Sequence, residues 1–307
     1  MSAVVLAVAL ALAPRATAAE PGLGTVLVDP TNAISQEWVV AAGQGRGCRL
    51  AVDPSGRPWL GCRERFIAAP NYAALFAAER PFNQLVWTDN GELLAASEDR
   101  LGVYGIAEAA KTWTSVSRVK FHTLRRSEGM TVRVFPGADK NAYAVFEGAG
   151  ASEVLLLTRR GDDWSARTLI KAKGSVSAVA GDGTRTFVAM GRKILGFATL
   201  PDGSLDPQPL WMHPQDDIVS LVWGPRAGLI YTTKSAVGFL GSRYRFEFMR
   251  ARSPQVVLGA RALYVMPEDG GVLKLEGIEG LERADGELAA TGAPIMYGPD
   301  PEAAAAR

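Results

Sequence analysis

The chain has 307 residues, of which 48% are hydrophobic and 21% are charged. This composition is that of a globular protein, and it excludes a chain that is disordered throughout. The 33 lysines and arginines balance the 32 aspartates and glutamates to a formal net charge of +1. A nearly neutral chain without a long basic run lacks the electrostatic footprint of proteins that bind nucleic acids or anionic membranes. We therefore expect no nucleic-acid partner and no membrane insertion.

The N-terminal residues 1–19 have the character of a signal peptide. Ala3 to Ala13 is an unbroken apolar run, Pro14 ends it, and the small residues Ala16-Thr-Ala-Ala19 offer a cleavage site. No Lys or Arg precedes the run, so a buried N-terminal helix is the alternative, and the true translation start could lie upstream. The prediction is an exported protein, periplasmic or extracellular.

The rest of the chain is predicted to form one domain, residues 20–290, followed by a flexible tail, residues 291–307. Within the domain, Cys48 and Cys62 flank a predicted β-hairpin with a turn at Asp53-Pro-Ser-Gly56. Folding the hairpin about this turn brings the two cysteines together, and an exported location permits their oxidation. Such a disulfide stabilises the fold by about 3 kcal/mol in a chain-entropy description. A catalytic pair is disfavoured, because the spacing is not Cys-x-x-Cys.

The most informative feature is an internal repeat. Residues 85–105 align without a gap with residues 221–241, and both begin with Leu-Val-Trp. Each unit contains three short apolar segments separated by turns. Weaker copies of the unit occupy residues 48–67, 131–157, 175–199 and 255–276, and fourth segments occur at residues 113–119, 164–170, 210–212 and 244–249. Four short strands per unit of roughly 40 residues are typical of propeller blades. The sequence therefore predicts an all-β fold, a single β-propeller of six four-stranded blades.

Residues 22–43 decide how the ring closes. They contain the apolar segments Thr25 to Val28 and Trp38 to Val40, which supply either the outer strand of the last blade or a degenerate seventh blade. Closure matters because it removes open sheet edges. Two stacked β-sandwiches are the alternative fold, but they do not account for the gap-free repeat. The segment from Asn71 to Glu79 is expected to form two helical turns between blades, capped by Asn71.

The repeat resembles the propeller repeats in the periplasmic sensor domains of two-component regulators. In those repeats an Asp-x-x-Gly turn precedes an apolar-Trp-apolar-Gly strand, which is matched here by Asp53-Pro-Ser-Gly56 and Trp59-Leu-Gly61. YVTN-type repeats of secreted propellers are nearly as similar. No kinase or transmembrane helix follows in this sequence. The resemblance implies an extracytoplasmic recognition domain.

The sequence carries no evident catalytic constellation. The only histidines, His122 and His213, occupy strand-like positions where a packed or solvated structural role is favoured. Neither a Gly-x-Ser-x-Gly elbow nor a phosphate-binding loop is present. The enzyme hypothesis that remains is a metal-dependent hydrolase: lactonase-like six-bladed propellers hold a divalent ion with Glu, Asp and Asn near the channel mouth, and such oxygen ligands suit Ca²⁺. From the sequence we assign no catalytic residue, no metal ligand and no cofactor, and Ca²⁺ belongs to this alternative alone.

Charged residues gather in the loops expected on one propeller face. Because successive strands are antiparallel, the loops between second and third strands open on the same face as the links between blades. The residues assigned to this face are Arg63, Arg65, Glu98, Asp99, Arg100, Arg192, Lys193, Lys234, Asp216 and Asp217. Cations among the acidic residues oppose a bound metal ion, so the mixture favours recognition of a polar partner.

The leading hypothesis is a non-enzymatic binding or scaffolding module that recognises a protein, peptide or glycan on this face. For any single residue of the set, a solvated loop charge without a role is the alternative. A third hypothesis makes the chain a structural subunit of a larger envelope assembly.

Overall fold

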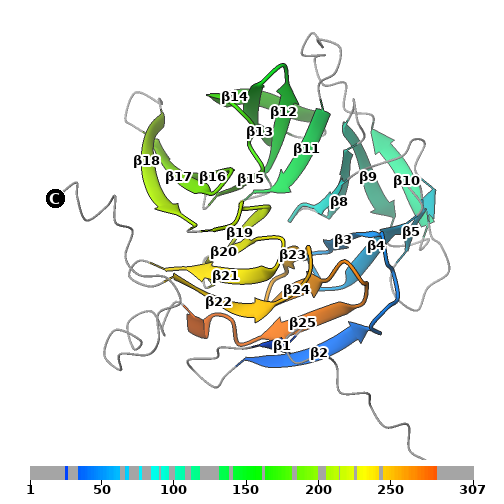
Figure 1. Cartoon of the computed structure of the whole chain (residues 1–307). Coiled ribbons are helices and arrows are strands. Elements are labelled where there is room, and N and C mark those ends of the chain that lie inside the picture. The colour runs from blue at the N-terminus through cyan, green and yellow to red at the C-terminus, as the bar shows by residue number, and fades with distance from the viewer. Residues whose placement is uncertain are drawn as a thin grey trace, which may run out of the picture.

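The computed structural model describes residues 25–26, 34–62, 66–68, 76–77, 84–89, 91–96, 101–107, 112–117, 131–137, 141–160, 163–181, 185–199, 205–213, 215–224, 227–241 and 245–281. The predicted signal peptide and C-terminal tail lie outside these residues. Within them, the chain forms six antiparallel sheets arranged in a ring (Figure 1). No helix in the described ranges has the length and apolar character needed to cross a membrane.

Each of the first three blades is a four-stranded sheet whose strands follow one another in chain order. Blade one contains β3 (Arg49–Val52), β4 (Pro58–Cys62), β5 (Phe66–Ala68) and β6 (Phe76–Ala77). Blade two contains β7 (Gln84–Trp87), β8 (Glu92–Ala96), β9 (Leu101–Ala107) and β10 (Thr112–Ser117). Blade three contains β11 (Thr131–Pro136), β12 (Ala142–Gly148), β13 (Ala151–Arg160) and β14 (Asp163–Lys173).

The remaining three blades continue the pattern, and two of them also recruit N-terminal strands. Blade four contains β15 (Ala178–Gly181), β16 (Arg185–Met190), β17 (Lys193–Thr199) and β18 (Leu205–Met212). Blade five contains β19 (Ser220–Gly224), β20 (Gly228–Thr232), β21 (Ala236–Leu240), β22 (Arg245–Arg250) and β1 (Thr25–Val26). Blade six contains β23 (Gln255–Leu258), β24 (Ala262–Met266), β25 (Val272–Glu276) and β2 (Ser35–Val40).

The first strand of each blade lies at the centre of the ring. These inner strands contact one another in the order β3, β7, β11, β15, β19 and β23, and β23 contacts β3 again. A closed circle of this kind is a β-propeller, as the sequence predicts, and it rules out two stacked sandwiches. The segment 22–43 makes no seventh blade, because its described strands β1 and β2 join blades five and six.

Closure joins the N-terminal strand to the last blade. Strand β2 pairs antiparallel with β25, with Gln36 opposite Leu275 and Trp38 opposite Leu273, and Figure 1 shows the two strands side by side. Across the same boundary, buried Leu50 and Leu60 of blade one share a hydrophobic core with residues of blade six. The fourth strand of blade six therefore comes from the beginning of the domain.

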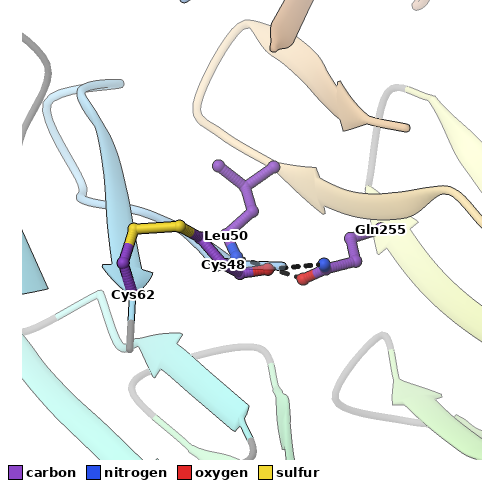
Figure 2. Close-up of a disulfide and its surroundings, with 4 residues drawn as sticks. All are labelled: Cys48, Leu50, Cys62 and Gln255. Carbon is purple, nitrogen blue, oxygen red and sulfur yellow. Dashed lines mark hydrogen bonds between the residues drawn. A yellow bond between two sulfur atoms is a disulfide. The ribbon is translucent and has the colours of Figure 1, made fainter. Parts of the chain in front are cut away.

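A glutamine side chain connects blade six to blade one beside the disulfide (Figure 2). The Leu50 backbone N–H donates to Gln255 Oε1 at 3.1 Å, and Gln255 Nε2 donates to the Cys48 carbonyl oxygen at 2.9 Å. The predicted bond between Cys48 and Cys62 is present, with the two Cα atoms 4.3 Å apart. Backbone groups of β3 that would otherwise lack partners are thereby satisfied by the neighbouring blade.

Large aromatic side chains fill the boundaries between blades. The rings of Trp59 in blade one and Trp87 in blade two lie 5.7 Å apart, and those of Phe187 in blade four and Trp223 in blade five lie 5.3 Å apart. Close packing also requires glycine at position 238, because a Cβ on Gly238 would lie 2.1 Å from the ring of Tyr231.

The helix expected from Asn71 to Glu79 is wrong where the structure describes it. Phe76 and Ala77 form strand β6, and they pair with Ile67 and Phe66 of β5. Pairing with β5 outweighs the local helix propensity of this segment, because the segment supplies the outer strand of blade one. Propensity is a weak preference that tertiary hydrogen bonding overrides.

Replacing Gln255 with Ala should destabilise the closed ring. The change removes two hydrogen bonds and leaves two half-buried backbone groups at the start of β3 unsatisfied, so we expect the free energy of unfolding to fall by about 2 kcal/mol. Gln84→Ala should cost less, since Gln84 Oε1 accepts one such bond, from Val134 N–H at 3.0 Å. The exposed Gln215→Ala serves as the control in urea denaturation. Equal stability of the three variants would contradict this role for Gln255.

Candidate binding face

The strand order defines two different faces of the ring. We call the face that carries the loops between second and third strands, together with the links between blades, the link face. The opposite face carries the hairpin turns between first and second strands, such as residues 53–57. These turns are short and internally bonded, with Gly56 N–H donating to the Asp53 carbonyl at 2.8 Å. The links between blades, such as the segment between β18 and β19, lie on the link face.

The loops and links of the link face are bonded to one another in a continuous arc from blade four to blade one. We call this the link arc, and it consists of residues 191–193, 215–219, 232–235, 251–253, 267–271 and 41–48. Neighbouring segments are joined by hydrogen bonds from a backbone N–H group to a carbonyl oxygen. With the donor given first, these bonds are Ile218–Gly191 (2.8 Å), Val219–Thr232 (2.8 Å), Ala251–Ser235 (3.0 Å), Glu268–Arg252 (2.9 Å) and Gly271–Gln44 (2.6 Å). The arc is thus held by main-chain bonds between different segments, and side chains such as that of Thr233 add further bonds to its backbone.

Glycine is required where the arc crosses from blade six toward blade one. Gly271 has a φ of +84°, which side chains rarely tolerate. A Cβ there would lie 2.5 Å from the ring of Trp38 and 2.8 Å from the Cα of Ala42. This close approach lets the Gly271 N–H reach the carbonyl of Gln44.

The structure brings part of the predicted charged set together on the link arc. Arg192, Lys193, Asp217 and Lys234 are exposed, and Asp216 is half-buried. Arg63, Arg65, Glu98, Asp99 and Arg100 lie outside the described residues. Exposed Arg46, Arg252, Glu268 and Asp269 also lie on the arc. Their charges alternate in sign along it, as expected for the loops of this face.

His213, one of the two histidines, is fully buried between blades four and five. Its ring packs against Trp211, with centroids 5.4 Å apart, and lies 6.0 Å from the ring of Tyr231. Nε2 lies 3.4 Å from Oε1 of Glu247 on β22. The prediction of a packed histidine is therefore correct for His213, whereas His122 lies outside the described residues.

Among the described residues, His213, Asp216 and Glu247 are the one group whose side chains are close enough to hold a metal ion. Their donor atoms do not fit one. Nδ1 of His213 accepts hydrogen bonds from the backbone N–H groups of Asp216 (2.8 Å) and Gln215 (3.2 Å), so the proton of the neutral ring is on Nε2, facing Glu247. A zinc ligand must offer a lone pair at that nitrogen, and Ca²⁺ prefers oxygen ligands.

The channel walls do not supply the ligands of a metal site either. The six inner strands described above contain no aspartate or glutamate, and their charged residues are Arg49 and Arg133. A divalent cation at the centre of the ring would have to be held by residues outside these strands. In the lactonase alternative the ligands would therefore come from loops at the channel mouth.

Sequence reasoning missed Glu247, the partner of His213. It lies in Arg245-Phe-Glu-Phe248, whose alternation predicts an exposed acidic residue on an outer strand. Its side chain faces the neighbouring blade and is only 12% exposed. Only the packing of one blade against the next reveals this pair, and no spacing in the sequence signals it.

The fold is shared with solved structures of several enzymes. A gluconolactonase from Xanthomonas campestris is 12% identical at a TM-score of 0.57, covering 77% of this chain and 88% of that chain. A virginiamycin B lyase from Staphylococcus aureus is 14% identical at a TM-score of 0.51, covering 79% and 99%. Regucalcin, a calcium-binding protein from Agrobacterium tumefaciens, is 13% identical at a TM-score of 0.54, covering 78% and 94%.

At these identities the similarity establishes the fold, a six-bladed β-propeller, and not the activity. No model of a known protein family matches the chain, and no curated protein sequence matches it. The predicted resemblance to sensor propellers is therefore correct at the level of the propeller fold, without assignment to a specific family.

Replacing His213 with Ala should destabilise the boundary between blades four and five. The change leaves a cavity among aromatic rings and deprives two backbone N–H groups of their acceptor. We therefore expect the free energy of unfolding, measured by urea denaturation, to fall by about 3 kcal/mol. Asp217 is an exposed residue nearby, and the free energy of unfolding of Asp217→Ala should differ from that of the parent by less than about 0.5 kcal/mol. Zn²⁺ should not raise the melting temperature of the parent. A fully stable His213→Ala variant, or stabilisation by Zn²⁺, would show that the pair has another role.

Proposed function

We propose that this propeller is an extracytoplasmic recognition module that binds a polar partner, a protein, peptide or glycan, on its link face. The observation that carries the proposal is the link arc. Its charged side chains belong to segments whose backbone is held by hydrogen bonds. The backbone of these segments therefore loses little conformational entropy when a ligand binds. Alternating charges on such a scaffold select partners with complementary charge and dipole patterns.

The disulfide supports the location in this proposal. Cys48 and Cys62 are bonded, and structural disulfides persist mainly in oxidising compartments. A periplasmic or extracellular propeller agrees with the sequence resemblance to sensor domains. The apolar run at residues 3–13 supports export in the same way.

Reversing charges on the link arc should weaken ligand binding. In a screen of immobilised peptides and glycans, the Arg192→Glu/Lys234→Glu variant should lose at least tenfold in affinity for any ligand that the parent captures. A tenfold loss corresponds to about 1.4 kcal/mol, within the range of a single charge-assisted hydrogen bond. Parent binding should also weaken as salt is raised, because exposed charges are screened.

The matched control is Arg261→Glu, an exposed cation on the opposite face in the turn between β23 and β24. Like each substitution in the double variant, it replaces a cation with an anion, but it leaves the residues of the link arc unchanged. Normal binding by the link-face variant, or equal losses in both variants, would remove the link face as the interface.

The second candidate function is that of a hydrolase or lyase acting on a small cyclic ester at the channel mouth. The fold similarity to a gluconolactonase and a lyase favours this candidate over recognition. The mixed charges on the hydrogen-bonded backbone of the link arc favour recognition.

Proton release distinguishes the two functions. Hydrolysis of a lactone yields a carboxylic acid, which lowers the pH of a weakly buffered solution. If recognition is the function, a panel of sugar lactones should hydrolyse at the buffer rate, both with added Ca²⁺ and with a chelator. Saturable hydrolysis that heat-denatured protein lacks would instead establish the enzyme and replace the recognition proposal.

A further inference from the structure

A half-buried ion pair at the boundary of blades three and four has the surroundings of a cation site. Arg133 is on the inner strand β11, near its link-face end. Its Nη2 donates to Oε2 of Glu147 at 2.5 Å and to the carbonyl oxygen of Val176, and its Nη1 donates to the carbonyl oxygen of Ser177 at 3.1 Å. One guanidinium thus meets a carboxylate and two backbone carbonyls.

These oxygens come from two blades. Glu147 lies at the end of β12 opposite Thr131 of β11, whereas Val176 and Ser177 belong to the link that leads into β15. Ser177 extends the connection to the next blade, because its hydroxyl donates to the carbonyl of Ile218 at 2.6 Å. The cation therefore bridges inner parts of the ring where carbonyl oxygens converge.

The side chain of Arg133 is partly shielded from solvent. The side chains of Arg133 and Glu147 are 28% and 29% exposed. Burial of the guanidinium lowers the pKa of Arg133 from its ordinary value, and the charge and hydrogen bond of Glu147 act in the opposite direction. An arginine retains its charge in such a setting, and its planar fork can reach several oxygens at once.

We infer that the Arg133 guanidinium serves as the built-in structural cation at this position, in place of a bound divalent ion. Glu147, Val176 and Ser177 offer the carboxylate and carbonyl oxygens that Ca²⁺ prefers. With a positive side chain among them, a second cation is repelled. The inference accounts for how the propeller holds these oxygens together without a metal, and it does not depend on which ligand the link face binds.

The inference makes one claim about the parent protein and one about a variant. The parent, after treatment with a chelator, should bind no Ca²⁺ at this boundary, and its melting temperature should be the same with and without Ca²⁺. Arg133→Ala should melt at a lower temperature than the parent, because it leaves Glu147 and two carbonyls without their cation. Saturating Ca²⁺ should then raise the melting temperature of this variant by roughly 5 °C.

Two further variants identify where the ion binds. In Arg133→Ala/Glu147→Gln the carboxylate is gone, so the stabilisation by Ca²⁺ should disappear. Arg167→Ala removes an exposed arginine from β14 of the same blade and should show no response to Ca²⁺. Thermal unfolding followed by circular dichroism, with calorimetric titration of CaCl₂, gives both readouts.

The inference is overturned if Ca²⁺ stabilises the parent as strongly as Arg133→Ala, or if folded Arg133→Ala gains no response to Ca²⁺. Should Arg133→Ala fail to fold in the chelator, its refolding in Ca²⁺ replaces the melting comparison, and failure there also overturns the inference. Arg133→Gln provides a milder variant, because it keeps a hydrogen-bond donor near the carbonyls while removing the charge.

Discussion

The closure of the ring between blade six and blade one is the constraint on which the other features depend. A sheet with open edges invites pairing with other chains, and a propeller avoids this only when its ends are joined. Here the join has three parts: β2 completes the sheet of β25, Gln255 bonds to β3, and the disulfide fixes the hairpin that receives this bond. Each blade can then bury its apolar side chains against two neighbours.

The candidate site follows from this closure, because the link arc runs across the joined boundary. Gly271 of blade six bonds to Gln44, in the segment that leads from β2 into blade one. The same inter-blade surfaces hold polar groups that could be mistaken for catalytic ones. His213 lies against Glu247 at one blade boundary, and Arg133 donates to the carbonyl oxygens of Val176 and Ser177 at another. Their geometry indicates that these groups help to hold neighbouring blades together.

Much of the fold could be predicted because the repeat is visible in the sequence. The two Leu-Val-Trp segments predict the positions of two inner strands. The turn between Cys48 and Cys62 predicts that these cysteines form a disulfide. The short helix was wrong at Phe76, since local propensity does not register the need for an outer strand. Pairs such as Arg133 with Glu147 could not be predicted, because they connect different strands and their third partners are backbone carbonyls, which carry no sequence signal. The alternation of charges on the link face was predictable, whereas its hydrogen-bonded backbone was not.

The most direct test of the account is amide hydrogen exchange measured residue by residue at Ile218, Ala251 and Gly271. Their N–H groups bond across different segments of the link arc. If closure of the ring makes the arc rigid, these amides should exchange only when the whole domain unfolds, as slowly as those of the inner strands. Exchange through local opening, with the blades still protected, would contradict a binding face that the fold holds ready for its partner.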